Sequence, residues 1–238
     1  EPFDHILFHS VLPYSNWETG ALCVSESFEA LIAGFQAAVW ELGRVPALHR
    51  TDNLSAATHD LREGGRTFNE RYRQVLEHYG VRPDANTPGR GHENGDVEQA
   101  HHRFKRAVEQ ALLLRGHRDF ESQAHYGQFL RHVLTGRNRG RQPKLREELD
   151  RMGVLPPTRL EDFRALRVVV SRFSTIRVGH NVYSVASRLM GETVEVRLYP
   201  ERLEVQSAGK RVATLDRLRG HGQAAIDYRH LIGSLVRK

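Results

Sequence analysis

The chain has 238 residues, of which 39% are hydrophobic and 27% are charged, a composition typical of a soluble globular protein with one or two domains. A single cysteine excludes an internal disulfide, and no apolar run reaches the roughly 18 residues that a membrane helix needs. The formal net charge of +6 favours a polyanionic partner such as nucleic acid. We find no signal peptide, so we expect a cytoplasmic protein with no membrane partner.

The first part of the chain predicts alternating strands and helices. Residues 5–12 and 16–24 indicate two strands. Apolar residues at helical spacing over 28–42 predict an amphipathic helix. A short strand at about 46–51 then brings Asp52 to its end. This order is typical of an α/β fold with a mixed sheet flanked by helices.

Capping residues and glycines mark the boundaries of these elements. The helix at 28–42 has Ser25 or Ser27 as its N-cap and Gly43 as its end. Residues 62–67 contain two adjacent glycines and predict a mobile loop. A further helix is expected over 68–79.

A long helix is expected from about Asn94 to Leu114, after a loop at 83–94 that is rich in Pro, Gly and Asn. Its buried side carries apolar residues at helical spacing. Polar residues three or four positions apart form a stripe along the helix, next to its buried side. The stripe contains Glu98, His102, Lys105 and Glu109.

The second half of the chain changes character. Residues 120–134 and 144–152 predict helices, linked by an Arg- and Gly-rich segment at 136–143. From Leu166 onward, short β-rich runs separated by turn residues predict a small β-barrel. The tail at 224–236 is expected to be a short helix or an extended arm.

Two acids stand out because each lies at the end or start of an element. Asp52 follows a predicted strand, and Glu98 lies in the first turns of the long helix. Each has an ordinary explanation, since Asp52 suits a turn or helix cap and Glu98 suits the helix dipole. Together with the basic residues behind Glu98, they indicate metal-dependent chemistry on a nucleic-acid phosphate.

Three segments carry a resemblance to a known family. They are Leu48-His-Arg-Thr-Asp52-Asn-Leu-Ser-Ala-Ala57, Glu93-Asn-Gly-Asp-Val-Glu98, and the β-rich stretch 174–185. In these the chain resembles the IstA-type insertion-sequence transposases of the D-D-E, retroviral-integrase-like superfamily. The resemblance implies an RNase H-like integrase core in which Asp52 and Glu98 are catalytic metal ligands. The ions implied are Mg²⁺, with Mn²⁺ as a substitute.

The resemblance also implies that this chain is a fragment. The family's first core strand, with the first catalytic Asp, and its N-terminal helix-turn-helix region have no counterpart here, and Asp4 is only a weak candidate for that Asp. We therefore expect the fragment alone to be inactive. The domains expected are a truncated core at 1–118, a basic helical linker at 119–163, a small β-barrel at 164–216 and a tail at 217–238.

The function implied is that of a bacterial DNA transposase. It would cleave the DNA at the ends of a mobile element and join those ends to a target, which is DNA integration and recombination by two-metal-ion phosphoryl transfer. The partners implied are DNA, further copies of the chain on paired DNA ends, and a helper AAA+ ATPase. The alternatives are an RNase H-like nuclease, a phage integrase, and a non-catalytic DNA-binding or architectural protein.

The basic residues divide into two groups by position. Lys105 and Arg106 follow Glu98 on its helix and are expected to meet the phosphate beside the scissile bond. A second group is expected to clamp the DNA backbone, affecting affinity and salt dependence. It consists of Arg137, Arg139, Arg141 and Lys144. The alternative for this second group is a flexible linker whose charge aids solubility.

Overall fold

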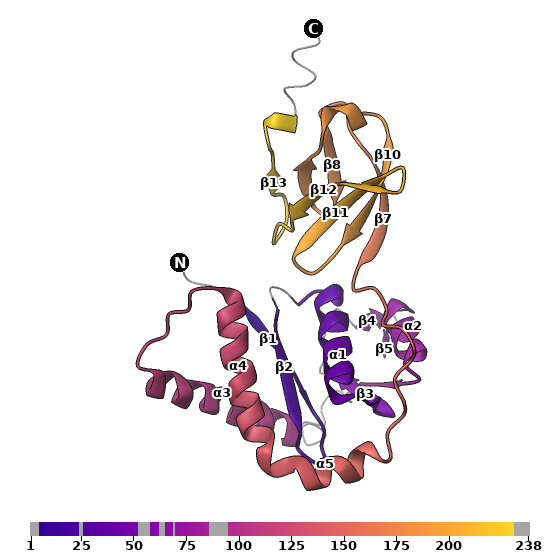
Figure 1. The fold of residues 1–238 in the computed structure, drawn as a ribbon. Helices are drawn as coiled ribbons and strands as arrows, with labels where there is room; N and C mark the ends of the chain where they lie inside the picture. The colour runs from indigo at the N-terminus through magenta and orange to yellow at the C-terminus, as the bar shows by residue number, and fades with distance from the viewer. Residues whose placement is uncertain are drawn as a thin grey trace. The chain divides into compact units, whose positions relative to one another are not determined.

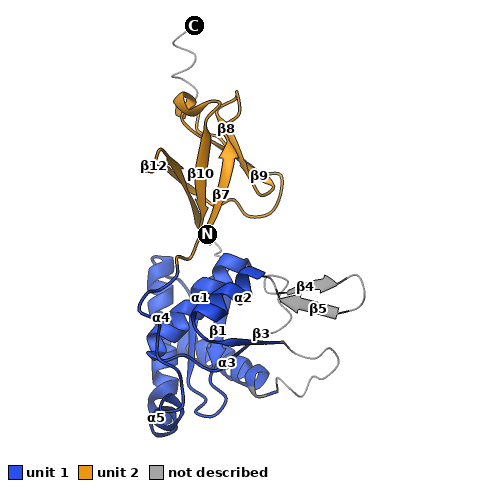
Figure 2. Cartoon of the chain, turned by 90° about the vertical axis from the view of Figure 1, so that its right-hand side faces the viewer, with its two compact units in different colours: residues 1–160 blue, residues 161–238 orange. Residues whose placement is uncertain are grey.

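The computed structural model describes residues 5–23, 26–51, 58–61, 65–68, 70–85 and 95–230. The chain divides into two compact units, residues 1–160 (unit 1) and residues 161–238 (unit 2), which Figure 2 colours separately. No helix in the described part of the chain combines the length and apolarity needed to cross a membrane.

The described strands of unit 1 pair two by two. β1 (Ile6–Val11) pairs antiparallel with β2 (Glu18–Cys23), β3 (Leu48–Thr51) parallel with β6 (Arg82–Ala85), and β4 (Thr58–Leu61) antiparallel with β5 (Gly65–Phe68). The mixed helix-and-sheet character expected from the sequence is confirmed. The single mixed sheet is not, because the described hydrogen bonds leave three separate pairs.

Helices cover both faces of the β1–β2 hairpin (Figure 1). The helices of unit 1 are α1 (Phe28–Leu42), α2 (Glu70–His78), α3 (Gly95–Arg115), α4 (Gln123–Asn138), the 3-10 turn η2 (Arg139–Arg141) and α5 (Gln142–Leu149). Strand alternation sends Phe8 of β1 toward α1, whereas Leu7 and Leu22 pack with α3 and α4. The hairpin is thus the middle layer of three.

The ends of α1 follow from its sequence. The Ser27 hydroxyl accepts a hydrogen bond from the Ala30 amide at 3.2 Å, which satisfies one of the free amides of the first turn. Gly43 adopts a φ of 74° and its amide bonds to the Val39 carbonyl at 3.0 Å. Both the Ser27 cap and the glycine end are confirmed predictions, since the chemistry involved is local.

Residues up to 160 belong to unit 1 because a buried glutamine of α1 holds them. The amide nitrogen of Gln36 donates to the Leu160 carbonyl at 3.1 Å, and its amide oxygen accepts from the Leu160 amide at 3.0 Å. Val45 and Gly153 form a further backbone bridge. The segment after α5 is therefore fastened to the layer that contains α1.

Three local expectations were wrong. Residues 136–143, expected to link two helices, are themselves helical from α4 through η2 into α5, which also rules out the flexible-linker alternative. Pro143 fits because it lies in the first turn of α5, where its missing amide costs nothing. Gly65 to Thr67 lie in strand β5 instead of a loop. Pro83 lies in β6, which among the described strands pairs with β3 alone.

Unit 2 is built from short strands around one apolar core. β12, β11, β10 and β7 form a four-stranded sheet, and β13, β9 and β8 form a second sheet of three strands. The bounds are β7 Arg164–Val169, β8 Thr175–Val178, β9 Asn181–Ser184, β10 Thr193–Leu198, β11 Arg202–Ser207, β12 Lys210–Asp216 and β13 Ala224–Ala225. The strands are as expected, but their described hydrogen bonds divide them between two sheets instead of one closed barrel.

The tail after β12 folds back onto unit 2. β13 runs parallel to β9, and the buried Ser184 hydroxyl accepts from the Asp227 amide at 2.7 Å and lies 3.0 Å from His230 Nδ1. Of the short helix or extended arm expected for this tail, residues 224–225 form a strand, and the chain turns helical at Arg229 and His230.

Candidate catalytic and DNA-contact site

Glu98 lies in the first turns of α3 with its side chain exposed. The opposite side of that helix is buried, with Phe104, Val108 and Leu112 in the cluster that α3 shares with α4 and the hairpin. The ring of His101, three residues after Glu98, meets the ring of His9 of β1 edge to face at 4.6 Å. The backbone that carries Glu98 is therefore fixed against the hairpin.

The strand that leads to Asp52 is fixed in a similar way. His49 Nδ1 lies 2.7 Å from the Tyr72 hydroxyl, and its ring lies 4.6 Å from that of Phe35 in α1. Burial lowers the pKa of His49 to about 4, so this imidazole is neutral near pH 7. Thr51, the last residue of β3, is buried. Asp52 itself lies outside the described residues.

The side chains around Glu98 offer few oxygen ligands for a metal ion. Within the described ranges, no group of three or more His, Cys, Asp or Glu side chains could hold a metal ion. Glu98 supplies one exposed carboxylate, and Mg²⁺ in phosphoryl-transfer sites is commonly held by one or two carboxylates with phosphate and water oxygens. Glu98 therefore fits as one ligand of a site whose other protein ligand would be Asp52.

A buried carboxylate joins the hairpin to α4 and η2. Glu18 of β2 is fully buried, with His9 Nε2 at 2.9 Å from one of its oxygens. Its other oxygen accepts hydrogen bonds from Arg137 Nε and from Arg141 Nη1, the latter at 2.9 Å. The Asn138 side chain also binds the Glu18 backbone. Its Oδ1 accepts from the Glu18 amide at 3.1 Å, and its Nδ2 donates to the Glu18 carbonyl at 2.7 Å. We call these residues the Glu18 cluster.

The electrostatics of the Glu18 cluster favour the charged carboxylate. Burial alone would raise the pKa of Glu18. The hydrogen bonds from His9 and Arg137, with the positive charges of Arg137 and Arg141, outweigh burial and lower the pKa from 4.5 to about 2. Glu18 is therefore ionised throughout the neutral range, where it compensates the two guanidinium groups.

The basic residues expected to contact DNA fall into two environments. Four of them, Lys105, Arg106, Arg139 and Lys144, are exposed. The side chains of Arg137 and Arg141 are only 18% and 22% exposed and are bound to Glu18. Arg137 also donates to the Arg103 carbonyl of α3 at 3.2 Å, so it ties α4 to the helix that carries Glu98.

Sequence reasoning missed the Glu18 cluster. Its two arginines lie 119 and 123 positions from Glu18, a separation that no local pattern connects. One signal was present: Glu18, Gly20 and Leu22 alternate onto the same face of the strand, so an acid falls in phase with an inward-facing leucine. A charge at such a position requires buried partners of opposite sign.

Three comparisons place the chain among known proteins. Residues 155–227 match the family described as Mu transposase, C-terminal domain. Over 244 residues the chain is 37% identical to "Uncharacterized protein y4jA/y4nE/y4sE" of Sinorhizobium fredii (strain NBRC 101917 / NGR234), covering 100% of this chain and 48% of that protein. It is 27% identical over 241 residues to a protein named "Transposase" of Aminobacter aminovorans, covering 97% and 47%.

The chain thus has transposase-type relatives and spans about half the length of the curated relatives it matches. A chain in the cryoEM structure of the simian T-cell lymphotropic virus intasome in complex with PP2A regulatory subunit B56 gamma has a similar fold. The TM-score is 0.50 at 13% identity, covering 89% of this chain and 70% of that chain. At this identity the likeness concerns the fold alone.

Proposed function

We propose that this chain is the catalytic core and C-terminal domain of an IstA-type, D-D-E transposase of a bacterial insertion sequence. The observation that carries the proposal is Glu98: an exposed acid in the first turns of a helix that is otherwise packed against a central hairpin. The relative named "Transposase", which covers 97% of the chain, and the Mu transposase C-terminal family over residues 155–227 support it. The reaction proposed is cleavage and strand transfer of element-end DNA.

The acidic residues and the basic residues have separate roles in this reaction. Asp52 and Glu98 are the carboxylate ligands of Mg²⁺, which when bound would lower the pKa of an attacking hydroxyl and stabilise the leaving oxygen. Lys105 and Arg106, exposed on the helix that carries Glu98, would neutralise the phosphate beside the scissile bond. Arg139 and Lys144 would hold the DNA backbone further along.

Arg137 and Arg141 have a different role from the exposed basic residues. Their contacts with Glu18 make them positioning residues that hold α4 and η2 against the hairpin, and Arg137 also reaches α3. A guanidinium that is already paired and four-fifths buried offers fewer donors to a phosphate than an exposed one. Any DNA contact by these two residues would be secondary to that role.

We also propose that a further strand, which carries the family's first catalytic Asp, lies between β1 and β3 in the active protein. In the described residues β1 pairs only with β2, and β3 only with β6. The same helix covers both pairs, since Gly34 of α1 meets the Phe8 ring of β1 and Phe35 meets the His49 ring of β3. A strand between them would join two marginal pairs into one mixed sheet.

The partners proposed are DNA, further copies of the chain assembled on paired element ends, and a helper AAA+ ATPase. The cytoplasm of a bacterium is the proposed location. The ATPase and the assembly rest on the family resemblance, whereas DNA is also supported by the positive net charge.

The test is strand transfer by the longest open reading frame that contains these residues, with element-end DNA and Mg²⁺. Glu98→Gln keeps the size of the side chain but removes its charge, so we expect the strand-transfer rate to fall by about 100-fold or more, with unchanged DNA affinity. Asp52→Asn should behave in the same way.

Glu109→Gln is the matched control, because Glu109 is exposed on the same helix and pairs with Arg118 at 2.6 Å. We expect it to keep strand transfer within about twofold of the unsubstituted protein. Salt-sensitive DNA binding without strand transfer at any protein length would favour the non-catalytic DNA-binding alternative. Equal losses in Glu98→Gln and Glu109→Gln would reject Glu98 as a ligand.

A further inference from the structure

Strand β1 presents a buried histidine to the helix that carries Glu98. Side chains alternate along the strand, so His9 lies on the same face as Leu7, which packs with α3 and α4. The His9 side chain is only 2% exposed, although histidine is a polar residue. Its place in the layer between the hairpin and α3 therefore calls for an explanation.

The His9 ring contacts two aromatic side chains of α3. It stacks on the Phe104 ring, with the centroids 4.8 Å apart and the planes at 22°, and it meets the His101 ring edge to face at 4.6 Å and 90°. His101 follows Glu98 by three positions, so the two residues lie on neighbouring turns of the same side of the helix. The ring thus holds α3 within about one turn of the Glu98 carboxylate.

Glu18 fixes the orientation of this ring. Because Glu18 is ionised in the neutral range, its oxygens can only accept, and His9 Nε2 at 2.9 Å must be the donor. Glu18 is itself held by Arg137 and Arg141. A half-turn of the imidazole would break its hydrogen bond to a buried charge, so the ring keeps one orientation toward α3.

Packing alone does not require a histidine at this position. The other ring nitrogen, Nδ1, is buried and has no hydrogen-bond partner among the described residues. An aliphatic side chain would fill the same layer without burying an unpartnered polar atom. It would lack both the flat ring that contacts α3 and the donor that Glu18 uses. His9 joins these two features in one side chain.

We propose that His9 is a positioning residue for Glu98: its ring, oriented by Glu18, seats the first turns of α3 and so places the carboxylate for metal binding. This inference rests on the proposed function, in which Glu98 is a ligand of Mg²⁺. His9 touches neither the ion nor the DNA. Mg²⁺ keeps its oxygen ligands at roughly 2.0–2.1 Å, so a displacement of α3 by about 1 Å would weaken coordination.

Two substitutions separate the ring of His9 from its hydrogen bond. His9→Gln keeps a donor for Glu18 but removes the ring that contacts α3. His9→Phe keeps a ring but removes the donor. His5→Gln is the matched control, because His5 directly precedes β1 and its ring meets Tyr126 of α4, at 5.0 Å, instead of α3.

Hydrogen exchange of the chain tests the seating of α3 without a metal ion. His9→Gln should speed amide exchange over residues 98–104 by about tenfold or more, and should leave α1 and α5 unchanged. His9→Phe and His5→Gln should keep exchange over residues 98–104 within about threefold of the unsubstituted chain. Equal acceleration in all helices of unit 1 would mean that His9 only stabilises the unit, and would overturn the inference.

Mn²⁺ binding, followed by electron paramagnetic resonance, tests the consequence at Glu98 in the protein encoded by the longest open reading frame. The unsubstituted protein should bind Mn²⁺ at a site that Glu98→Gln removes. His9→Gln should weaken this binding by about tenfold, the usual effect of losing a group that orients a metal ligand. DNA affinity should not change.

His9→Phe should have the opposite profile. Its Mn²⁺ affinity should stay within about threefold of the unsubstituted protein, because the ring still seats α3. Its urea midpoint should fall by about 1 M, because buried Glu18 loses a hydrogen bond. His5→Gln should leave Mn²⁺ affinity unchanged.

The outcomes separate this inference from the proposed function. Full Mn²⁺ affinity in His9→Gln would overturn the inference, and so would equal losses in His9→Gln and His9→Phe. Either result would leave Glu98 as a metal ligand. Mn²⁺ binding that survives Glu98→Gln would instead reject Glu98 as a ligand in the proposed function, and the inference with it, even where hydrogen exchange shows that His9 seats α3.

Discussion

Glu18→Gln is expected to lower the free energy of unfolding of unit 1 by about 3–5 kcal/mol, the usual cost of removing one partner from a buried ion pair. The carboxylate is fully buried and is bound by His9, Arg137 and Arg141. A glutamine of the same size would leave the two guanidinium groups without a compensating charge. The loss should therefore far exceed that of an ordinary surface substitution.

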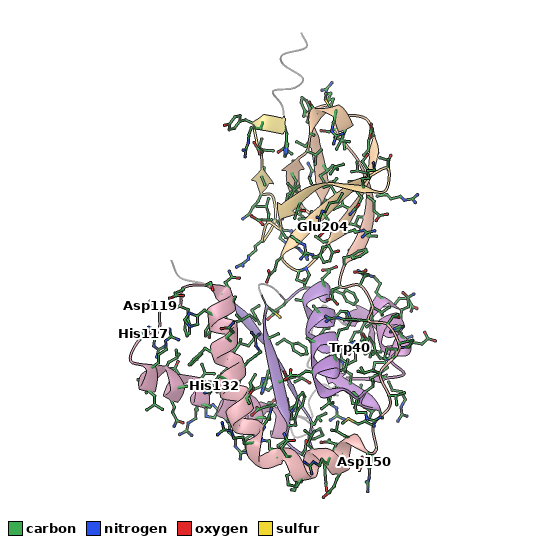
Figure 3. All side chains as sticks on the ribbon, viewed as in Figure 1. Trp40, His117, Asp119, His132, Asp150 and Glu204 are labelled. Atoms are coloured by element: carbon green, nitrogen blue, oxygen red, sulfur yellow. The ribbon has the colours of Figure 1, made fainter. Side chains whose placement is uncertain are left out.

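Both tryptophans of the chain, Trp17 and Trp40, lie in unit 1, and Figure 3 labels Trp40. Their fluorescence during urea unfolding therefore follows this unit alone. The control is Glu109→Gln, which breaks a pair whose side chains are 66% and 54% exposed. Exposed pairs contribute little, so this control should cost less than about 1 kcal/mol. Equal costs for the two substitutions would contradict the role assigned to the Glu18 cluster.

The same cluster predicts a dependence of stability on pH. The pKa of Glu18 is about 2 in the folded chain and 4.5 as its ordinary value. Because the pKa is lowered in the folded chain, ionised Glu18 adds about 3 kcal/mol to the free energy of unfolding above pH 4.5. This contribution is lost as the pH falls toward 2. The unsubstituted chain should lose this stability between pH 4.5 and 2, and Glu18→Gln should not.

His49 titrates in a separate window and serves as an internal reference. Its pKa is lowered by burial from 6.5 to about 4, so protonation favours the unfolded chain as the pH falls from 6.5 to 4. That loss should be the same with and without Glu18→Gln. A difference between the two forms above pH 5 would contradict the assignment of the acidic window to Glu18.

Gly34→Ala is expected to lower the free energy of unfolding of unit 1 by about 1–3 kcal/mol, although alanine favours helix by about 1 kcal/mol over glycine. A Cβ at Gly34 would lie 2.5, 2.6 and 2.8 Å from three ring carbons of Phe8, including Cγ. Because Cγ lies on the axis of χ2, turning the ring about that axis cannot relieve the contact. Either Phe8 would have to leave its χ1 rotamer, or the strand and the helix would have to separate.

Gly136→Ala is the matched control, since Gly136 is also helical and nothing lies within 4 Å of a Cβ built there. It should stabilise unit 1 by up to about 1 kcal/mol. A second comparison uses Phe8→Ala, which removes the obstructing ring. In that background Gly34→Ala should no longer destabilise, and a cost that persists there would rule out the contact with Phe8 as the cause.

Local chemistry explains what the sequence could predict. Ser27 and Gly43 end α1 as expected because each acts on backbone groups within four residues of itself. The strands of unit 2 were predictable because the alternation of inward Val194, Val196 and Leu198 with polar residues has a period of two. The rows of residues across this sheet could not be predicted, because they depend on strand register, which no single strand contains.

Long-range contacts explain the features that the sequence could not predict. Arg137 and Arg141 look like free surface charges in a basic stretch, and only the approach of Glu18 assigns them a partner. The glycine and proline residues at 136–143 also led to a wrong prediction, a break between two helices. Gly136 and Pro143 flank a stretch that nevertheless stays helical, because Pro143 lies in the first turn of α5 and Asn138 is held by the Glu18 backbone.

The Glu18 cluster has a consequence for the order in which the chain folds. The β1–β2 hairpin is local and can form early, but the bonds of Glu18 close over 119 and 123 residues. During synthesis the hairpin therefore exists before its compensating arginines have emerged, and burial of Glu18 must wait for them. Completion of the three-layer arrangement is thus a late, cooperative event, and a nascent chain that ends before Arg137 would leave this carboxylate in water.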